Sequence, residues 1–74
     1  MGETTDYVVC IDNTDYGSSL EIRKIYQLVP DGDAERRDML RVVDESGEDY
    51  LYPSSRFLRI ELPKEVVAAL NRAA

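Results

Sequence analysis

Five short runs rich in β-branched and aromatic residues constrain the fold of this chain more than any other feature. The runs cover Tyr7–Ile11, Lys24–Pro30, Met39–Asp44, Asp49–Pro53 and Phe57–Leu62. Such residues favour extended backbone, and the segments between them contain the Asp, Asn, Gly, Ser and Pro residues that form turns. The sequence therefore predicts an all-β fold of five strands.

The connections between these strands differ in length. Asp12–Ser19 is long enough for a sizeable loop, and Asp31–Asp38 is a polar connection with one helical turn at Ala34–Arg37. Ser46-Gly47 suits a tight two-residue hairpin turn. Pro53–Arg56 breaks the strand pattern before the last strand.

A two-residue turn at Ser46-Gly47 predicts the register of the hairpin, because it opposes Val42 to Leu51 and Val43 to Tyr50. Both faces of the hairpin are then apolar: Leu40, Val42 and Leu51 lie on one, and Val43, Tyr50 and Tyr52 on the other. One face belongs to the core. The other is covered by the chain itself, or it is a tyrosine-rich patch that awaits a partner.

The last twelve residues change to a helical period. Pro63 suits the first position of a helix, and Val66, Val67 and Leu70 fall on one stripe. An isolated helix of this length is marginal in water, so we expect it to dock on the strands. The expected organisation is a flexible N-terminus at 1–6, a barrel at 7–62 and a docked C-terminal helix at 63–74.

Composition excludes several kinds of chemistry. The chain has 74 residues, no His, one Cys and a net charge of −6. Without His it lacks the commonest general base and metal ligand. Cys10 lies in an apolar strand, where we expect a buried and unreactive thiol, while Asp12 and Asp15 fit turn positions better than a calcium loop. We expect no catalytic residue, no metal site, no cofactor and no enzymatic activity.

The acidic charge also bears on partners and location. The net negative charge disfavours nucleic-acid binding, because such binding depends on cations that neutralise phosphates. No stretch approaches the length of a membrane span, and the N-terminus lacks the pattern of a signal peptide. A single thiol suits a reducing compartment, so we expect a cytoplasmic protein without membrane association.

The order of these elements resembles the SH3-like barrel. The long first loop takes the place of the RT loop, Asp31–Asp38 that of the n-Src loop, and Ser46-Gly47 that of the distal hairpin. Tyr52–Phe57 resembles the short 3₁₀ turn that precedes the last strand. The resemblance implies a five-stranded SH3-like barrel with a short C-terminal α-helix. The segments CIDNT and DESGEDYLYP also resemble a group of small bacterial proteins of unassigned activity.

The SH3-like resemblance also suggests a binding surface. It implies that the first loop, the third and fourth strands and the 3₁₀ turn share one side, which carries Tyr16, Tyr50, Tyr52, Pro53 and Arg56. Polyproline recognition is not expected, because Arg56 stands where the family's turn has a ligand-facing Tyr. The alternative reading is that Tyr50 or Tyr52 belongs to the core.

These observations favour a small non-catalytic protein-interaction or accessory module whose partner is another protein. One alternative is a small-ligand or regulatory sensor that uses the first loop with Tyr50 and Tyr52. The other is an RNA- or ribosome-associated barrel. Its cationic set would be Arg23, Lys24, Arg36, Arg37, Arg41 and Arg56.

Overall fold

The computed structural model describes residues 6–73, and these residues form a mostly β structure with five strands and a C-terminal helix. The elements are β1 (Asp6–Cys10), β2 (Ile25–Val29), α1 (Gly32–Arg36), β3 (Met39–Val43), β4 (Asp49–Pro53), η1 (Ser54–Arg56), β5 (Phe57–Ile60) and α2 (Lys64–Ala73). All five predicted strands are therefore present, with boundaries that differ by at most two residues.

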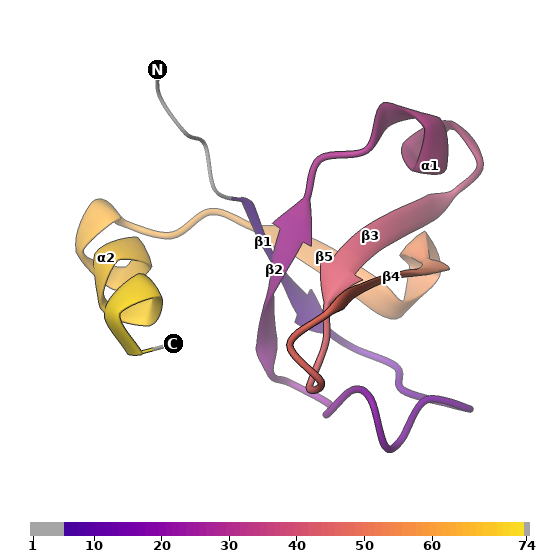
Figure 1. Cartoon of the computed structure of the whole chain (residues 1–74), viewed down its shortest axis with the longest axis horizontal. Helices are drawn as coiled ribbons and strands as arrows, with labels where there is room; N and C mark the ends of the chain where they lie inside the picture. The colour runs from indigo at the N-terminus through magenta and orange to yellow at the C-terminus, as the bar shows by residue number, and fades with distance from the viewer. Residues whose placement is uncertain (1–5, 74) are drawn as a thin grey trace.

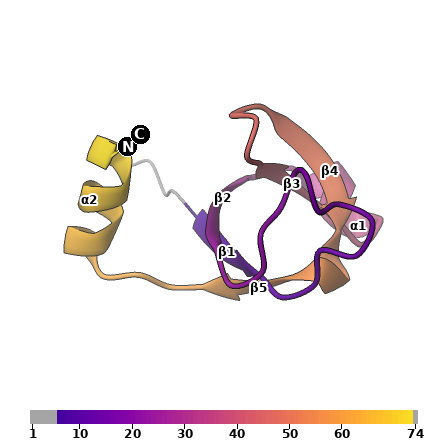
Figure 2. The same cartoon turned by 90° about the horizontal axis from the view of Figure 1, so that it is seen from below.

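The strands form one antiparallel sheet in the order β4-β3-β2-β1-β5. Consecutive strands from β1 to β4 are neighbours, and β5 returns to pair with β1. The sheet is open, since β4 and β5 are its two edge strands and are not neighbours in the hydrogen-bonded order. Figure 2 shows that the sheet curves strongly, so that one face surrounds the core.

The core lies on the concave face and follows from the alternation of side chains along each strand. Val8 and Cys10 of β1, for example, are both 0% exposed. The remaining core residues are Leu20, Tyr26, Leu28, Leu40, Val42, Tyr52 and Phe57. Leu20 comes from the loop before β2 and is 0% exposed, so it fastens that loop to the sheet. The predicted burial of Cys10 is confirmed.

The predicted register of the β3–β4 hairpin is wrong by one residue. Val42 lies opposite Tyr50, and Leu40 lies opposite Tyr52. The turn contains three residues, because Asp44 N–H donates to the Glu48 carbonyl at 3.1 Å. Gly47 adopts a φ of +86°, the left-handed conformation that a three-residue hairpin loop requires. The predicted face assignment is therefore wrong too, and Tyr50 and Tyr52 share the core face with Leu40 and Val42.

Helix α1 is a single capped turn, close to the expected Ala34–Arg37. Asp31 caps its N-terminus, with Oδ1 accepting a 3.1 Å hydrogen bond from Ala34 N–H. The other oxygen of Asp31 accepts from Arg41 Nε at 2.9 Å, which ties the helix to β3. Asp38 then takes a φ of 60° and turns the chain into β3.

Helix α2 stands beside β1 and β2 and is joined to β5 by an extended segment (Figure 1). Leu70 lines a groove of about 410 Å³ together with residues of β2 and β3 that include Ile25 and Val43. Val66, on the same stripe, is 38% exposed. Tight docking of the helix stays a prediction.

Two sequence-based expectations concern the N-terminus and membranes. Residues 1–5 of the expected flexible segment lie outside the described residues, while Asp6 is the first residue of β1. Within residues 6–73, neither helix is long and apolar enough to cross a membrane.

Candidate functional site

The loop between β1 and β2 has a defined conformation that fixes Tyr16. Asp12 Oδ1 accepts hydrogen bonds from Thr14 N–H at 2.9 Å and from Thr14 Oγ1 at 2.7 Å. Asn13 Nδ2 donates to the Leu20 carbonyl at 3.0 Å, and Tyr16 N–H donates to the Asn13 carbonyl at 2.8 Å. Asp12 is therefore a turn residue, as predicted. The loop holds the half-buried Tyr16 against the sheet.

Three of the predicted site residues form one stack. The rings of Tyr16 and Tyr52 meet edge to face, with centroids 5.0 Å apart and an interplanar angle of 89°. The Arg56 guanidinium lies 5.5 Å from the centroid of Tyr16, and its Nη1 forms an ion pair with Asp12 Oδ2 at 3.0 Å. Edge-to-face rings and cations over rings are favourable arrangements. The stack joins the first loop, β4 and η1.

The buried carboxylate of Asp44 holds one member of this stack, Tyr52, by a hydrogen bond. Asp44 is 7% exposed, and its Oδ2 accepts a 2.5 Å hydrogen bond from the Tyr52 hydroxyl. Its Oδ1 accepts from Ser46 N–H at 2.9 Å and from Ser46 Oγ at 2.6 Å. Burial alone would raise the pKa of Asp44, but the hydrogen bonds from Ser46 and Tyr52 outweigh it and hold the pKa below its usual value. Burial and the bond to Asp44 raise the pKa of Tyr52 to about 12.

A second hydrogen-bond network connects the hairpin tip, the turn at residues 44–48, to Tyr26 of β2. Glu45 Oε2 accepts a 2.5 Å hydrogen bond from the Tyr26 hydroxyl and pairs with Lys24 Nζ at 2.6 Å. Glu45 N–H also donates to the Ser19 carbonyl at 3.1 Å. The bonds from Lys24 and Tyr26 lower the pKa of Glu45, whereas burial and the Glu45 bond raise that of Tyr26 well above its usual value. The first loop and the hairpin tip are thus held together.

Residues of the first network line a shallow groove of about 390 Å³, which we call the tyrosine groove. Its lining residues are Tyr16, Ser19, Asp44, Ser46, Tyr50, Leu51 and Tyr52. Tyr50 is 49% exposed, so aromatic surface faces solvent here. The Tyr50 hydroxyl donates to Glu48 Oε1 at 3.0 Å. The groove presents an aromatic surface whose rings and loops are held by the hydrogen bonds of the two networks, with serine and tyrosine hydroxyl groups in its lining.

The structure brings together most, though not all, of the predicted residues. Tyr16, Tyr50 and Tyr52 line the tyrosine groove, while Arg56 reaches the site through the ring of Tyr16. Pro53 is half-buried at the end of β4, opposite Met39, and does not line the groove. Tyr52 is both a core residue and part of the groove wall.

Sequence reasoning missed four residues of the lining: Ser19, Asp44, Ser46 and Leu51. For Asp44 a signal was present, since Asp at the first position of a turn often accepts bonds from the residue two positions later. The Asp-x-Ser spacing of Asp44 and Ser46 fits that pattern. Ser19 and Leu51 carry no comparable local signal.

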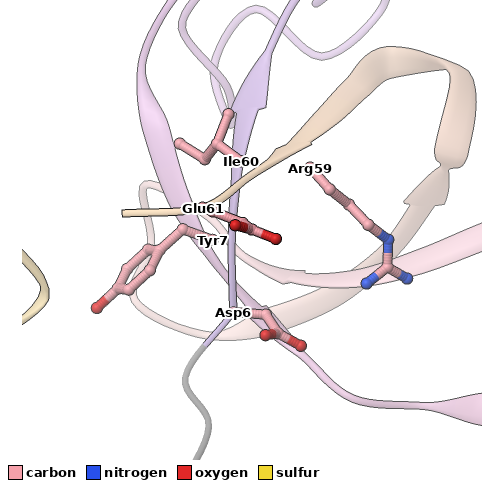
Figure 3. A pocket seen from close by; sticks show the side chains of 5 residues that line it. All are labelled: Asp6, Tyr7, Arg59, Ile60 and Glu61. Carbon is pink, nitrogen blue, oxygen red and sulfur yellow. The ribbon is translucent and has the colours of Figure 1, made fainter. Parts of the chain in front are cut away.

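A second pocket, shown in Figure 3, lies where β1 and β5 pair. It measures about 280 Å³ and is lined by Asp6, Tyr7, Arg59, Ile60 and Glu61. Arg59 points away from the two carboxylates and pairs with Glu35 at 3.2 Å. Tyr7 is only 6% exposed and offers little aromatic surface. The pocket contains none of the predicted residues, so the tyrosine groove is the better candidate site.

Over residues 6–73, no three side chains among Cys, Asp and Glu gather closely enough to hold a metal ion. No family model matches the chain, and neither a curated protein nor a solved structure matches it. Function is therefore inferred from the tyrosine groove.

Proposed function

We propose that this chain is a non-catalytic interaction module that binds an extended segment of a partner protein in the tyrosine groove. The observation that carries the proposal is the stack of Tyr16, Tyr52 and Arg56, with the half-exposed Tyr50 beside it. Tyrosine contributes large contact area at low entropic cost, which is why it is enriched at interfaces. A groove held rigid before binding also loses less entropy when its partner docks.

The proposed framework is an SH3-like barrel. In its favour are the strand order β4-β3-β2-β1-β5, the strong curvature in Figure 2 and the 3₁₀ turn between β4 and β5. The first loop, the hairpin tip and the 3₁₀ turn meet at the tyrosine groove. Loops on a rigid scaffold are frequent sites of recognition. Because Arg56 pairs with Asp12 and covers Tyr16, the proposed recognition differs from the gripping of polyproline helices.

Binding is proposed over catalysis because the carboxylates nearest the groove already have hydrogen-bond partners. Asp44 accepts from Tyr52 and Ser46, and Glu45 accepts from Tyr26 and Lys24. These bonds lower the pKa of both groups, whereas a general acid at neutral pH needs a raised one. The two carboxylates stabilise the hairpin tip.

A protein partner is also favoured over RNA by the ion pairs. Lys24, Arg41 and Arg56 pair with Glu45, Asp31 and Asp12, and Arg36 pairs with Asp33. Phosphate binding by these cations would have to compete with a carboxylate at each position. The proposed location is the cytoplasm, where a lone buried thiol such as Cys10 stays reduced.

The test is a selection from a display library of short random peptides on the immobilised chain. We expect enriched peptides whose binding is lost in Tyr50→Ser. The matched control is Leu58→Ser, which removes an apolar side chain that is 57% exposed on β5. Selected peptides that bind both variants equally, or a library that yields none, would refute a peptide site in the tyrosine groove.

A further inference from the structure

We infer that the tyrosine groove takes an arginine side chain of the partner segment, held against the ring of Tyr50 between Glu48 and the buried Asp44. This inference rests on the proposed function and names the chemistry of its partner. It follows from the charges around the groove and from the geometry of its rings.

The first observation is the distribution of charge in the lining. Asp44 is the only charged residue among the seven that line the tyrosine groove. It is 7% exposed, and the bonds from Ser46 and Tyr52 keep its pKa low, so it is ionised at neutral pH. A charge that is shielded from water acts on a ligand with less screening than a surface charge. The floor of the groove therefore attracts a cation.

The second observation is that the rim adds negative charge and little positive charge. Asp15 and Asp49 each adjoin a lining residue in the chain, and Glu48 accepts a hydrogen bond from the Tyr50 hydroxyl. All three acidic residues are exposed. The cations that lie closest are balanced already: Arg56 pairs with Asp12 at 3.0 Å, and Lys24 pairs with Glu45 at 2.6 Å. The whole chain carries a net charge of −6. A positively charged partner segment is thus complementary in sign both locally and over long range.

The third observation is that tyrosine rings in this chain already bind cations. The Arg56 guanidinium lies 5.5 Å from the centroid of Tyr16, and Lys24 Nζ lies 5.7 Å from that of Tyr26. Among the residues that the structure describes, no cation lies over the ring of Tyr50, and about half of the surface of Tyr50 is exposed. Its hydroxyl donates to Glu48 Oε1 at 3.0 Å, so a ring and a carboxylate lie side by side.

Arginine fits this arrangement better than lysine. A planar guanidinium stacks on an aromatic ring while its N–H groups donate to a neighbouring carboxylate. An ammonium group satisfies one of these contacts at a time and keeps more of its water. We therefore expect lysine to replace arginine only with loss of affinity.

The experiment uses a synthetic copy of a peptide obtained in the display selection. Chemical-shift mapping first shows that this peptide binds in the tyrosine groove. Each arginine of that peptide is replaced in turn by citrulline, which keeps the shape and removes the charge, and by lysine. We expect roughly tenfold weaker binding for the critical citrulline peptide and a smaller loss for lysine. Glu48→Gln in the protein should lower the affinity for the arginine peptide and leave the affinity for the citrulline peptide unchanged. Glu61→Gln, at the pocket of Figure 3, is the matched control.

The outcomes separate this inference from the proposed function. Groove-binding peptides without basic residues, or equal affinity for arginine and citrulline, would overturn the arginine subsite and leave the interaction module standing. Failure to select any peptide that maps to the groove would overturn both. The citrulline comparison changes only the peptide, so its result does not depend on how a protein variant folds.

Discussion

The hydroxyl of Tyr52 donates a 2.5 Å hydrogen bond to the carboxylate of Asp44, and both residues are buried, at 4% and 7% exposure. The bond connects the residue that follows β3 with the second half of β4 and supports the floor of the tyrosine groove. Through the ring of Tyr52 it also orients Tyr16, 5.0 Å away. One polar contact thus contributes to both the stability of the hairpin and the shape of the candidate site.

Tyr52→Phe removes the donor to Asp44 and keeps the ring. Because a buried carboxylate then loses a charge-assisted bond, we expect the free energy of unfolding to fall by about 1–3 kcal/mol. Tyr50→Phe is the matched control, since Tyr50 is 49% exposed and bonds to an exposed Glu48. Urea denaturation of the two variants measures the difference, and equal stabilities would contradict the structural role of the bond.

Gly47→Ala tests the three-residue turn. Gly47 has a φ of +86°, and a Cβ there would meet nothing within 4 Å, so the cost is purely conformational. We expect a loss of about 1–2 kcal/mol in the free energy of unfolding. Gly17→Ala also meets open space, at a backbone conformation without a positive φ, and should leave stability unchanged. A two-residue turn of different geometry would be indicated if both variants behaved alike.

The free energy of unfolding should fall at acidic pH. Hydrogen bonds lower the pKa of Asp44 and Glu45 in the folded chain, below 3.8 and 4.5 respectively. The unfolded chain then binds more protons, so the stabilisation is complete above about pH 5 and is lost as the pH falls through the lowered folded values. Urea denaturation at a series of pH values measures this curve. Asp44→Asn should flatten it, and an unchanged curve would show that Asp44 does not contribute.

Cys10 should react slowly with thiol reagents in the native chain. It is 0% exposed, and burial raises the pKa of its thiol, so little thiolate is present at neutral pH. The same reagent in denaturant gives the reference rate. Rapid, stoichiometric labelling without denaturant would mean that β1 opens readily or that the thiol is accessible.

Truncation after Leu62 measures the docking of α2. Val67 and Leu70 are half-buried, and Leu70 faces Ile25 and Val43 across a groove of about 410 Å³. Partial burial of two aliphatic side chains predicts a loss of about 1–3 kcal/mol. An unchanged melting temperature would show that α2 folds independently of the sheet. Leu70→Asp in the full chain separates loss of this contact from loss of the helix.

Much of the candidate site could be predicted from residue types and order, because β1 to β4 pair in chain order and β5 returns to β1, which leaves few topologies. Tyr16, Tyr50 and Tyr52 were placed on one side, and the structure brings all three to one groove. Pro53, which the resemblance also places on this side, pairs with Met39 at the end of β4 and is not among the residues that line the groove. Asp44 was missed, because its burial depends on a partner eight residues away.

By itself, the sequence determined where each strand lies, that the tail is helical and that Cys10 is buried. These properties follow from local propensity and from the alternation of side chains, which neighbouring residues settle among themselves. Tertiary structure alone decided the register of β3 against β4, because Ser46-Gly47 is compatible with turns of two or three residues and a shift of one residue reverses the faces. It also decided that Tyr52 is buried while Tyr50, on the same face, is exposed, because the core extends under the second half of β4 and the first half, next to the hairpin turn, projects beyond it.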